Sequence, residues 1–289
     1  MRPRRSVLFV PGSNARALEK ARGLEVDALI FDLEDSVAPD AKGAARQAIA
    51  VAVAHGGYGR RELILRVNAL GTEWAEDDLK AAAQMKLHAV LLPKVESEAE
   101  PRKAEAILIS AGAPLDLGIW CMIETARATL HAEAIAMATP RLAAFVMGTA
   151  DLSKELHAEE RPLREPMTTA LGLCVLAARA YGLAVLDGVH FDIADEEGFV
   201  QSCRQGRRLG FDGKTLIHPS TIAAANRVFA PDAAALAQAR RVIAAFDQAK
   251  AQGRGVAVLD GRLVERLHVA EAERILALAA AIGMPHTDD

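Results

Sequence analysis

Eight short runs rich in branched apolar residues recur along the chain, and stretches with helical character separate them. The runs are Ser6–Val10, Ala28–Asp32, Leu63–Val67, Ala89–Pro93, Asp116–Ile123, Leu142–Met147, Leu183–Asp187 and Lys214–Ile217. Strands that alternate with helices indicate βαβ units and a parallel sheet. Eight units in 289 residues favour a closed barrel over an open sheet, because one (β/α)8 barrel occupies about 250 residues.

Composition supports this fold class. The chain is 51% hydrophobic but only 4% aromatic, so its core is built from Ala, Leu, Val and Ile, which suits parallel strands covered by helices on both faces. After Pro219 the sequence is Ala-rich and helical to about Gln252, crosses a Gly-rich segment, Gly253–Gly261, and ends in a helical stretch, Glu271–Ile282. We therefore predict an α/β TIM barrel over residues 1–225 and a C-terminal helical extension over residues 226–289.

Charge and hydropathy exclude several classes of partner. A net charge of -4 and a pI near 6.1 offer no positive field for nucleic acid or an anionic membrane. No apolar stretch approaches the roughly 20 residues of a membrane helix, and the basic opening lacks the features of a signal peptide. The three cysteines are far apart and form no CxxC pair, which argues against a disulfide framework or a zinc site. We expect a soluble cytoplasmic protein.

Polar residues follow six of the eight predicted strands, where a packed core would not select them. They are Asp32 to Asp35, Arg66 with Asn68, Lys94, Glu124, Asp151 and His218. The carboxyl ends of barrel strands form one mouth, where the reactive groups of such enzymes lie. These side chains are therefore expected to converge on one site.

Glu124 and Asp151 follow consecutive strands and are the predicted metal ligands. Magnesium takes one or two carboxylates and leaves its other positions for water and substrate oxygens, and Mn²⁺ fits the same ligands. Each carboxylate taken alone is equally well explained as a helix cap. Acids at three strand ends repel one another unless a cation neutralises them, which favours a shared metal site.

Basic groups and a histidine have two interpretations each. Arg66 lies in an apolar strand, so it holds either a substrate carboxylate or a structural ion pair with Asp32 or Glu34, and the two can coexist. The turn Pro11–Arg16 leads into a helix whose amides, with Arg16 and Lys20, either meet the phosphates of a cofactor or form an ordinary turn. His218 is an acid or base, or a structural hydrogen-bonding group.

Ordered motifs over nearly the whole chain resemble the citrate lyase β-subunit-like, or malyl-CoA lyase, branch of the HpcH/HpaI aldolase superfamily. They are Arg5–Gly12, Ile30–Asp35, Arg66–Asn68, Leu92–Glu96, Ile123–Ala126, Gly148–Leu152, Gly210–Lys214 and Ile217–Pro219.

The resemblance implies a TIM barrel in which Glu124 and Asp151 bind Mg²⁺ and Arg66 holds a 2-oxo acid. It places Gly148 and Ala150 at the substrate, and Asp32 and Glu34 in the catalytic site, where the acidic run acts through metal-bound water. It also implies a homotrimer or homohexamer in which the C-terminal extension covers a neighbouring subunit's active site.

One motif departs from the related lyases. Their C-terminal segment reads Asp-Gly-(Arg/Lys)-Met-(Ile/Val)-Asp, and its last Asp is the base that acts on the acyl-CoA methyl group. This chain has Asp260–Glu265, so the base position is Glu265, one methylene longer. The extra carbon shifts the carboxylate by about an ångström, enough to alter the geometry of proton transfer.

The resemblance predicts a Mg²⁺-dependent lyase first, with a thioesterase as the alternative and a non-catalytic binding subunit as a second alternative. As a lyase, the enzyme cleaves or forms malyl-CoA-type esters, giving a 2-oxo acid such as glyoxylate or pyruvate and an acyl-CoA. As a (3S)-malyl-CoA thioesterase, it uses Glu265 to direct water at the thioester and gives malate and CoA. As a citrate-lyase-like subunit, it binds CoA esters or oxo acids without turnover.

Overall fold

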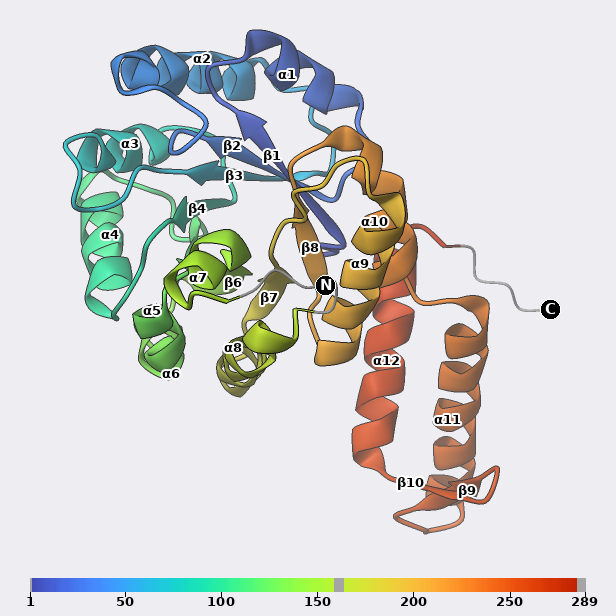
Figure 1. Cartoon of the computed structure of the whole chain (residues 1–289). Helices are drawn as coiled ribbons and strands as arrows, with labels where there is room; N and C mark the ends of the chain where they lie inside the picture. The colour runs from blue at the N-terminus through green and yellow to red at the C-terminus, as the bar shows by residue number, and fades with distance from the viewer. Residues whose placement is uncertain (1, 159–163, 285–289) are drawn as a thin grey trace. The chain divides into compact units, whose positions relative to one another are not determined.

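Eight parallel strands close into a barrel, as predicted. The computed structural model describes residues 2–158 and 164–284. The strands are β1 (Ser6–Pro11), β2 (Ala28–Asp32), β3 (Glu62–Arg66), β4 (Ala89–Leu92), β5 (Gly118–Ile123), β6 (Leu142–Met147), β7 (Ala184–Asp187) and β8 (Gly213–Leu216). They pair in chain order, and β1 pairs with β8 to close the ring (Figure 1).

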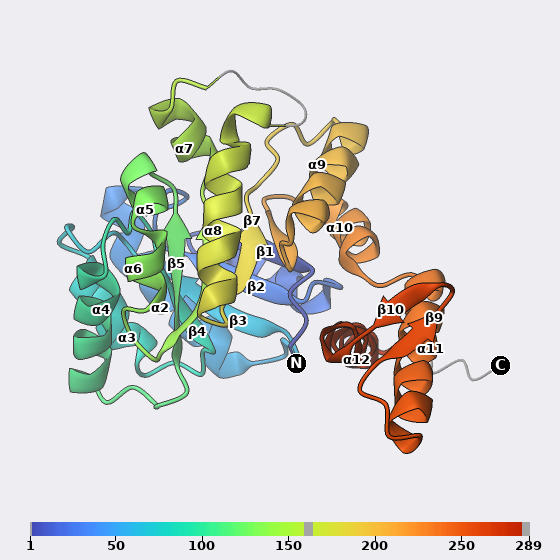
Figure 2. The same cartoon turned by 90° about the horizontal axis from the view of Figure 1, so that it is seen from below.

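Helices follow the strands and cover the outside of the barrel (Figure 2). The barrel's α-helices are α1 (Ala15–Lys20), α2 (Lys42–His55), α3 (Ala75–Ala82), α4 (Ala99–Ser110), α5 (Ala126–Leu130), α6 (Ala132–Ala136), α7 (Thr149–Glu155), α8 (Thr168–Ala180), α9 (Glu196–Leu209) and α10 (Ile222–Phe229). Short 3-10 helices lie at Ala21–Gly23, Pro39–Ala41, Glu165–Met167 and Pro219–Thr221.

Alternation along each strand creates two apolar layers. Side chains such as Ile30, Ile64 and Trp120 fill the barrel interior, which is therefore a packed core and not a pore. Their neighbours, such as Phe31 and Leu65, face the helices. Because the interior is closed by packing, polar side chains at the carboxyl ends of the strands are left above this core, and that end positions the site.

Arg4–Phe229 form one compact unit, and the described residues from Ala230 to Met284, together with Arg2 and Pro3, belong to a second. The sequence placed this boundary near Asn226, but α10 continues to Phe229 and packs on α9 of the barrel. In the second unit α11 (Ala233–Ala251) lies beside α12 (Arg266–Ala281). The described helices include none that is both long and apolar enough to span a membrane.

A β-hairpin corrects the prediction for the Gly-rich segment. The strands β9 (Ala257–Leu259) and β10 (Arg262–Val264) pair antiparallel where only an irregular crossing was expected. Their two-residue turn has φ +50° at Asp260 and +75° at Gly261. An Asp-Gly pair with both φ values positive is the preferred two-residue hairpin turn, so the sequence favours the hairpin locally.

Candidate active site

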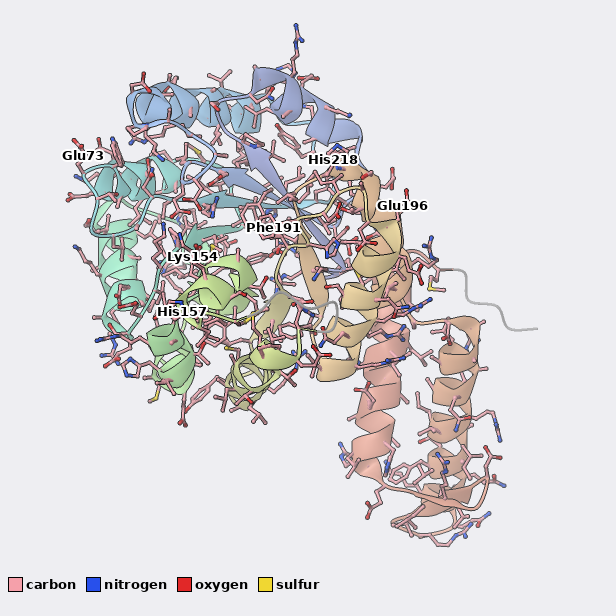
Figure 3. The ribbon with its side chains drawn as sticks, viewed as in Figure 1. Glu73, Lys154, His157, Phe191, Glu196 and His218 are labelled. Carbon is pink, nitrogen blue, oxygen red and sulfur yellow. The ribbon has the colours of Figure 1, made fainter. Side chains whose placement is uncertain are left out.

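A cavity of about 530 Å³ opens at the carboxyl ends of the strands. Its polar lining includes Asp32, Asp35, Arg66, Glu124 and Asp151. The segments that follow the strands surround this mouth, and Figure 3 shows side chains from several of them, including Lys154 of α7, Phe191 after β7 and His218 after β8. The structure therefore brings together most of the residues that the sequence placed at strand ends.

An ion pair between adjacent strand ends lies at the base of the cavity. Register aligns Asp32 of β2 with Arg66 of β3. The Nε and Nη2 atoms of Arg66 donate to Asp32 Oδ1 and Oδ2 at 2.6 and 2.7 Å. Burial alone would raise the pKa of Asp32, but Arg66, together with hydrogen bonds from the Ser36 and Glu34 amides, outweighs burial and holds that pKa below its ordinary value.

The Nε and Nη2 edge of the Arg66 guanidinium, which could have held a substrate carboxylate, therefore already binds Asp32. Its Nη1 atom also lies 2.8 Å from Glu34 Oε2. The structural ion pair, one of the two predicted roles of Arg66, is present and involves both Asp32 and Glu34. Bidentate capture of a substrate through Nε and Nη2 is not available in this arrangement, so a substrate would contact the remaining N–H groups of Arg66.

Glu124 is buried at the end of β5 and receives a hydrogen bond from the Lys94 amide to its Oε1 atom, at 2.5 Å. Burial is the main reason that the pKa of Glu124 is raised to about 7. The negative charges of Glu34 and Asp151 also raise it, while the hydrogen bond from the Lys94 amide lowers it in part. Asp151 lies in the first turn of α7 and is exposed. The two predicted metal ligands thus line one cavity and interact electrostatically.

Gly148 and Ala150, predicted at the substrate, also line the cavity. Gly148 lies between β6 and α7, and a Cβ atom on it would lie 2.2 Å from Glu124 Cβ and 2.6 Å from Glu124 Oε2. No side chain fits in this space. The glycine therefore lets the end of β6 approach Glu124 closely, which brings α7 and Asp151 to the same side of the cavity as Oε2.

The charges at the mouth fit a divalent cation. Five carboxylates (Asp32, Glu34, Asp35, Glu124 and Asp151) face two cationic side chains, Arg66 and Lys94. Within the described residues there is no group of three or more close His, Cys, Asp or Glu ligands. A pair of hard oxygen ligands with open positions matches Mg²⁺ and not a closed zinc site.

The metal-free protein is expected to lose stability as pH rises from about 5 to 8. The pKa of Glu124 is raised in the folded state to about 7, so the folded protein holds a proton that the unfolded chain has released. The resulting stabilisation is complete below the unfolded pKa and disappears as pH rises through the folded pKa. The effect is on the order of 2 kcal/mol. Urea unfolding in chelator should show it, and Glu124→Gln, which cannot titrate, should lack it; identical pH profiles would contradict the prediction.

Other predicted residues lie elsewhere or have structural partners. Arg16 and Lys20 are exposed on α1, where the Asn14 side chain already accepts from the Ala17 amide. His218 Nδ1 accepts from the Ser220 amide at 3.2 Å, which agrees with the structural one of its two predicted roles.

Asn68 is also held away from the cavity lining. Its amide and Nδ2 both donate to Asp78 Oδ2 in α3, at 3.0 and 2.6 Å. Glu265 belongs to the second unit, where it is the N-cap residue that precedes α12. It is exposed, and its amide donates to His268 Nδ1 at 3.0 Å.

Two features of the site had no assigned role in the sequence interpretation. Lys94 was noted only as a polar strand end, and nothing indicated that its main chain would contact Glu124. The cavity also has an apolar wall formed by Phe9, Met122, Met147 and Phe191. Phe9 and Met122 lie in strands, where alternation could have assigned them to the interior. Met147 ends β6 and belongs to the layer that faces the helices, so alternation does not predict its place in the cavity. Phe191 is in a loop, and no local pattern indicated its position.

The model of the HpcH/HpaI aldolase/citrate lyase family matches residues 5–219. A (3S)-malyl-CoA thioesterase of Cereibacter sphaeroides is 52% identical, covering 97% of this chain and 96% of the relative. An L-malyl-CoA/beta-methylmalyl-CoA lyase of the same species is 36% identical, covering 98% and 96%. The crystal structure of the protein CitE from Mycobacterium tuberculosis, in complex with magnesium, acetoacetate and coenzyme A, is 32% identical, with a TM-score of 0.77 over 95% of this chain and 97% of that one.

Proposed function

Because this chain belongs to the HpcH/HpaI aldolase/citrate lyase family, we propose that it is a Mg²⁺-dependent thioesterase that hydrolyses (3S)-malyl-CoA to malate and CoA. The observation that carries the proposal is the 52% identity to a (3S)-malyl-CoA thioesterase over almost the full length of both chains, against 36% to a lyase. This order reverses the sequence interpretation, which placed the lyase first.

The site supports a metal-dependent reaction on a small acid. Glu124 and Asp151 would hold the cation, for which Mn²⁺ is a possible substitute for Mg²⁺. When bound, Mg²⁺ supplies a Lewis acid that fixes the oxygens of the malyl group. Asp32 holds Arg66 at the base of the cavity, so the guanidinium presents its remaining N–H groups in a fixed orientation. The apolar wall, including Met122 and Met147, excludes water from one side of the site.

Glu265 is the proposed general base for hydrolysis. Its carboxylate is exposed at the start of α12, directly after the hairpin strand β10. The hairpin and the start of α12 also expose apolar side chains, including Val258, Leu263 and Leu267. Exposed apolar groups favour a covering partner. We propose that this segment covers the active site of a neighbouring subunit in a homotrimer or homohexamer, where Glu265 would take a proton from the attacking water.

The decisive experiment follows free thiol and glyoxylate separately while the protein acts on (3S)-malyl-CoA with Mg²⁺. We expect thiol without glyoxylate, because hydrolysis breaks the thioester and leaves the carbon skeleton intact. Glyoxylate without thiol would replace the proposal with the lyase reaction. Neither product, together with measurable binding of the CoA ester, would favour the non-catalytic subunit.

Glu265→Gln is the matched variant for the base. The amide keeps the size of the side chain but cannot take a proton at neutral pH, so thiol release should fall by about 100-fold or more. Mg²⁺ affinity, measured by calorimetry, should be unchanged, because Glu265 is not a proposed ligand. A variant that hydrolyses the ester at the normal rate would remove Glu265 from the mechanism without affecting the metal assignment.

A further inference from the structure

Lys94 has an unusual backbone conformation directly after β4. Its φ is +52°, in the left-handed region that residues with a Cβ atom rarely adopt. Apart from glycine, positive φ occurs among the described residues only at Lys94, His157, Arg164 and Asp260. Lys94 lies between two buried residues, Pro93 and Val95. A strained residue persists only where its surroundings hold it, so the contacts of Lys94 must compensate for the strain.

The main chain of Lys94 contacts the proposed metal ligand. Its amide donates to Glu124 Oε1 at 2.5 Å. The other oxygen, Oε2, faces Gly148. A Cβ atom placed on that glycine would lie only 2.6 Å from Oε2. The amide therefore occupies one oxygen of Glu124 and leaves free the oxygen on the side of α7, the helix that carries Asp151.

The side chain of Lys94 contacts a different carboxylate. Its Nζ atom lies 2.9 Å from Glu34 Oε1, while Arg66 Nη1 lies 2.8 Å from Glu34 Oε2. Glu34 is buried, so an unneutralised charge there would be costly. The ion pair thus ties the ammonium of Lys94 to a carboxylate that Arg66 also holds. This contact explains how the left-handed turn is maintained without a glycine.

We propose that Lys94 is a positioning residue for the cation site, which acts through its main chain: the left-handed turn presents the amide that orients Glu124, and the ammonium secures that turn through Glu34. The proposal rests on the Mg²⁺ site of the proposed function. Lys94 thus has two separable roles, one of its main chain and one of its charge, and the role of the main chain controls the affinity for Mg²⁺.

The test compares variants that separate backbone conformation from charge. Lys94→Gly and Lys94→Asn both lose the ammonium, but glycine and asparagine adopt the left-handed conformation readily. Lys94→Ala loses the same charge and does not. Mg²⁺ affinity of the full-length protein, measured by calorimetry without substrate, should change by less than about 3-fold in the Gly and Asn variants and fall by about 10-fold in the Ala variant.

A matched control is available at Asp260, which also has positive φ and an ion pair, to Arg241 at 2.6 Å. Asp260→Gly and Asp260→Ala should bind Mg²⁺ equally.

Equal Mg²⁺ affinities in Lys94→Gly and Lys94→Ala would overturn the role of the backbone, whether both variants bind normally or both bind weakly. Absence of Mg²⁺ binding in the unmodified protein would overturn the metal site itself, and therefore the proposed function as well. Urea unfolding identifies any variant that has lost its fold.

Discussion

Glu124→Ala should abolish Mg²⁺-dependent turnover of the CoA ester while the barrel remains folded. Asp151 alone would be left as a carboxylate ligand, and it is exposed, so it cannot hold the cation in a defined place. Loss of groups that merely contact a ligand costs about 10- to 100-fold in metal affinity or activity, so loss of a ligand should cost more. The measurement is the rate of ester turnover with Mg²⁺ and with chelator, alongside Mg²⁺ affinity by calorimetry.

The fold should survive because Glu124 lies above the barrel core. The Ala variant does leave the Lys94 amide without its acceptor, at a cost of about 1 to 3 kcal/mol. Glu124→Gln provides the milder comparison, since its side-chain oxygen can still accept from that amide. Glu76→Ala, which removes an exposed acid of α3, is the control and should leave turnover unchanged. Activity in Glu124→Ala that equals the parent and ignores chelator would refute the metal assignment.

Arg66→Met should lower the free energy of unfolding by about 3 to 5 kcal/mol, in addition to any loss of activity. Asp32 is buried and would keep a negative charge with its bidentate partner gone. Burial would then raise the pKa of Asp32 instead of being outweighed by Arg66. The side chain of Met is apolar and of comparable length, so the loss would come from the unpaired carboxylate and not from a large cavity.

Urea unfolding of Arg66→Met, Asp32→Asn and the double variant measures this interaction as a thermodynamic cycle. The double variant should recover part of the stability, because its buried carboxylate has been removed as well. Lys80→Met is the matched control: its ion pair with Glu76 is exposed on α3 and screened by solvent, so its loss should leave the free energy of unfolding essentially unchanged. A cost below about 1 kcal/mol for Arg66→Met would show that the pair is not structural.

Local pattern was sufficient to predict the barrel. Each of the eight predicted strands overlaps a strand of the structure, because runs of branched apolar residues buried on both faces have few alternative conformations. The acids at the strand ends were also found correctly as a group that converges. The hairpin after Val256 was not predicted, since a hairpin this short depends on its turn residues, and runs of apolar residues do not reveal them.

The list of residues at the mouth, including Glu124, Asp151 and Arg66, was readable from the chain alone, because every strand of a parallel barrel delivers its last residues to the same end. Their partners were not. Pairing of Arg66 with Asp32 depends on the register of β2 and β3. The Lys94 amide reaches Glu124 because of one left-handed turn, and the pKa of Glu124 depends on how deeply it is buried. Register, turn conformation and burial arise only when distant segments pack together, and no local pattern encodes them.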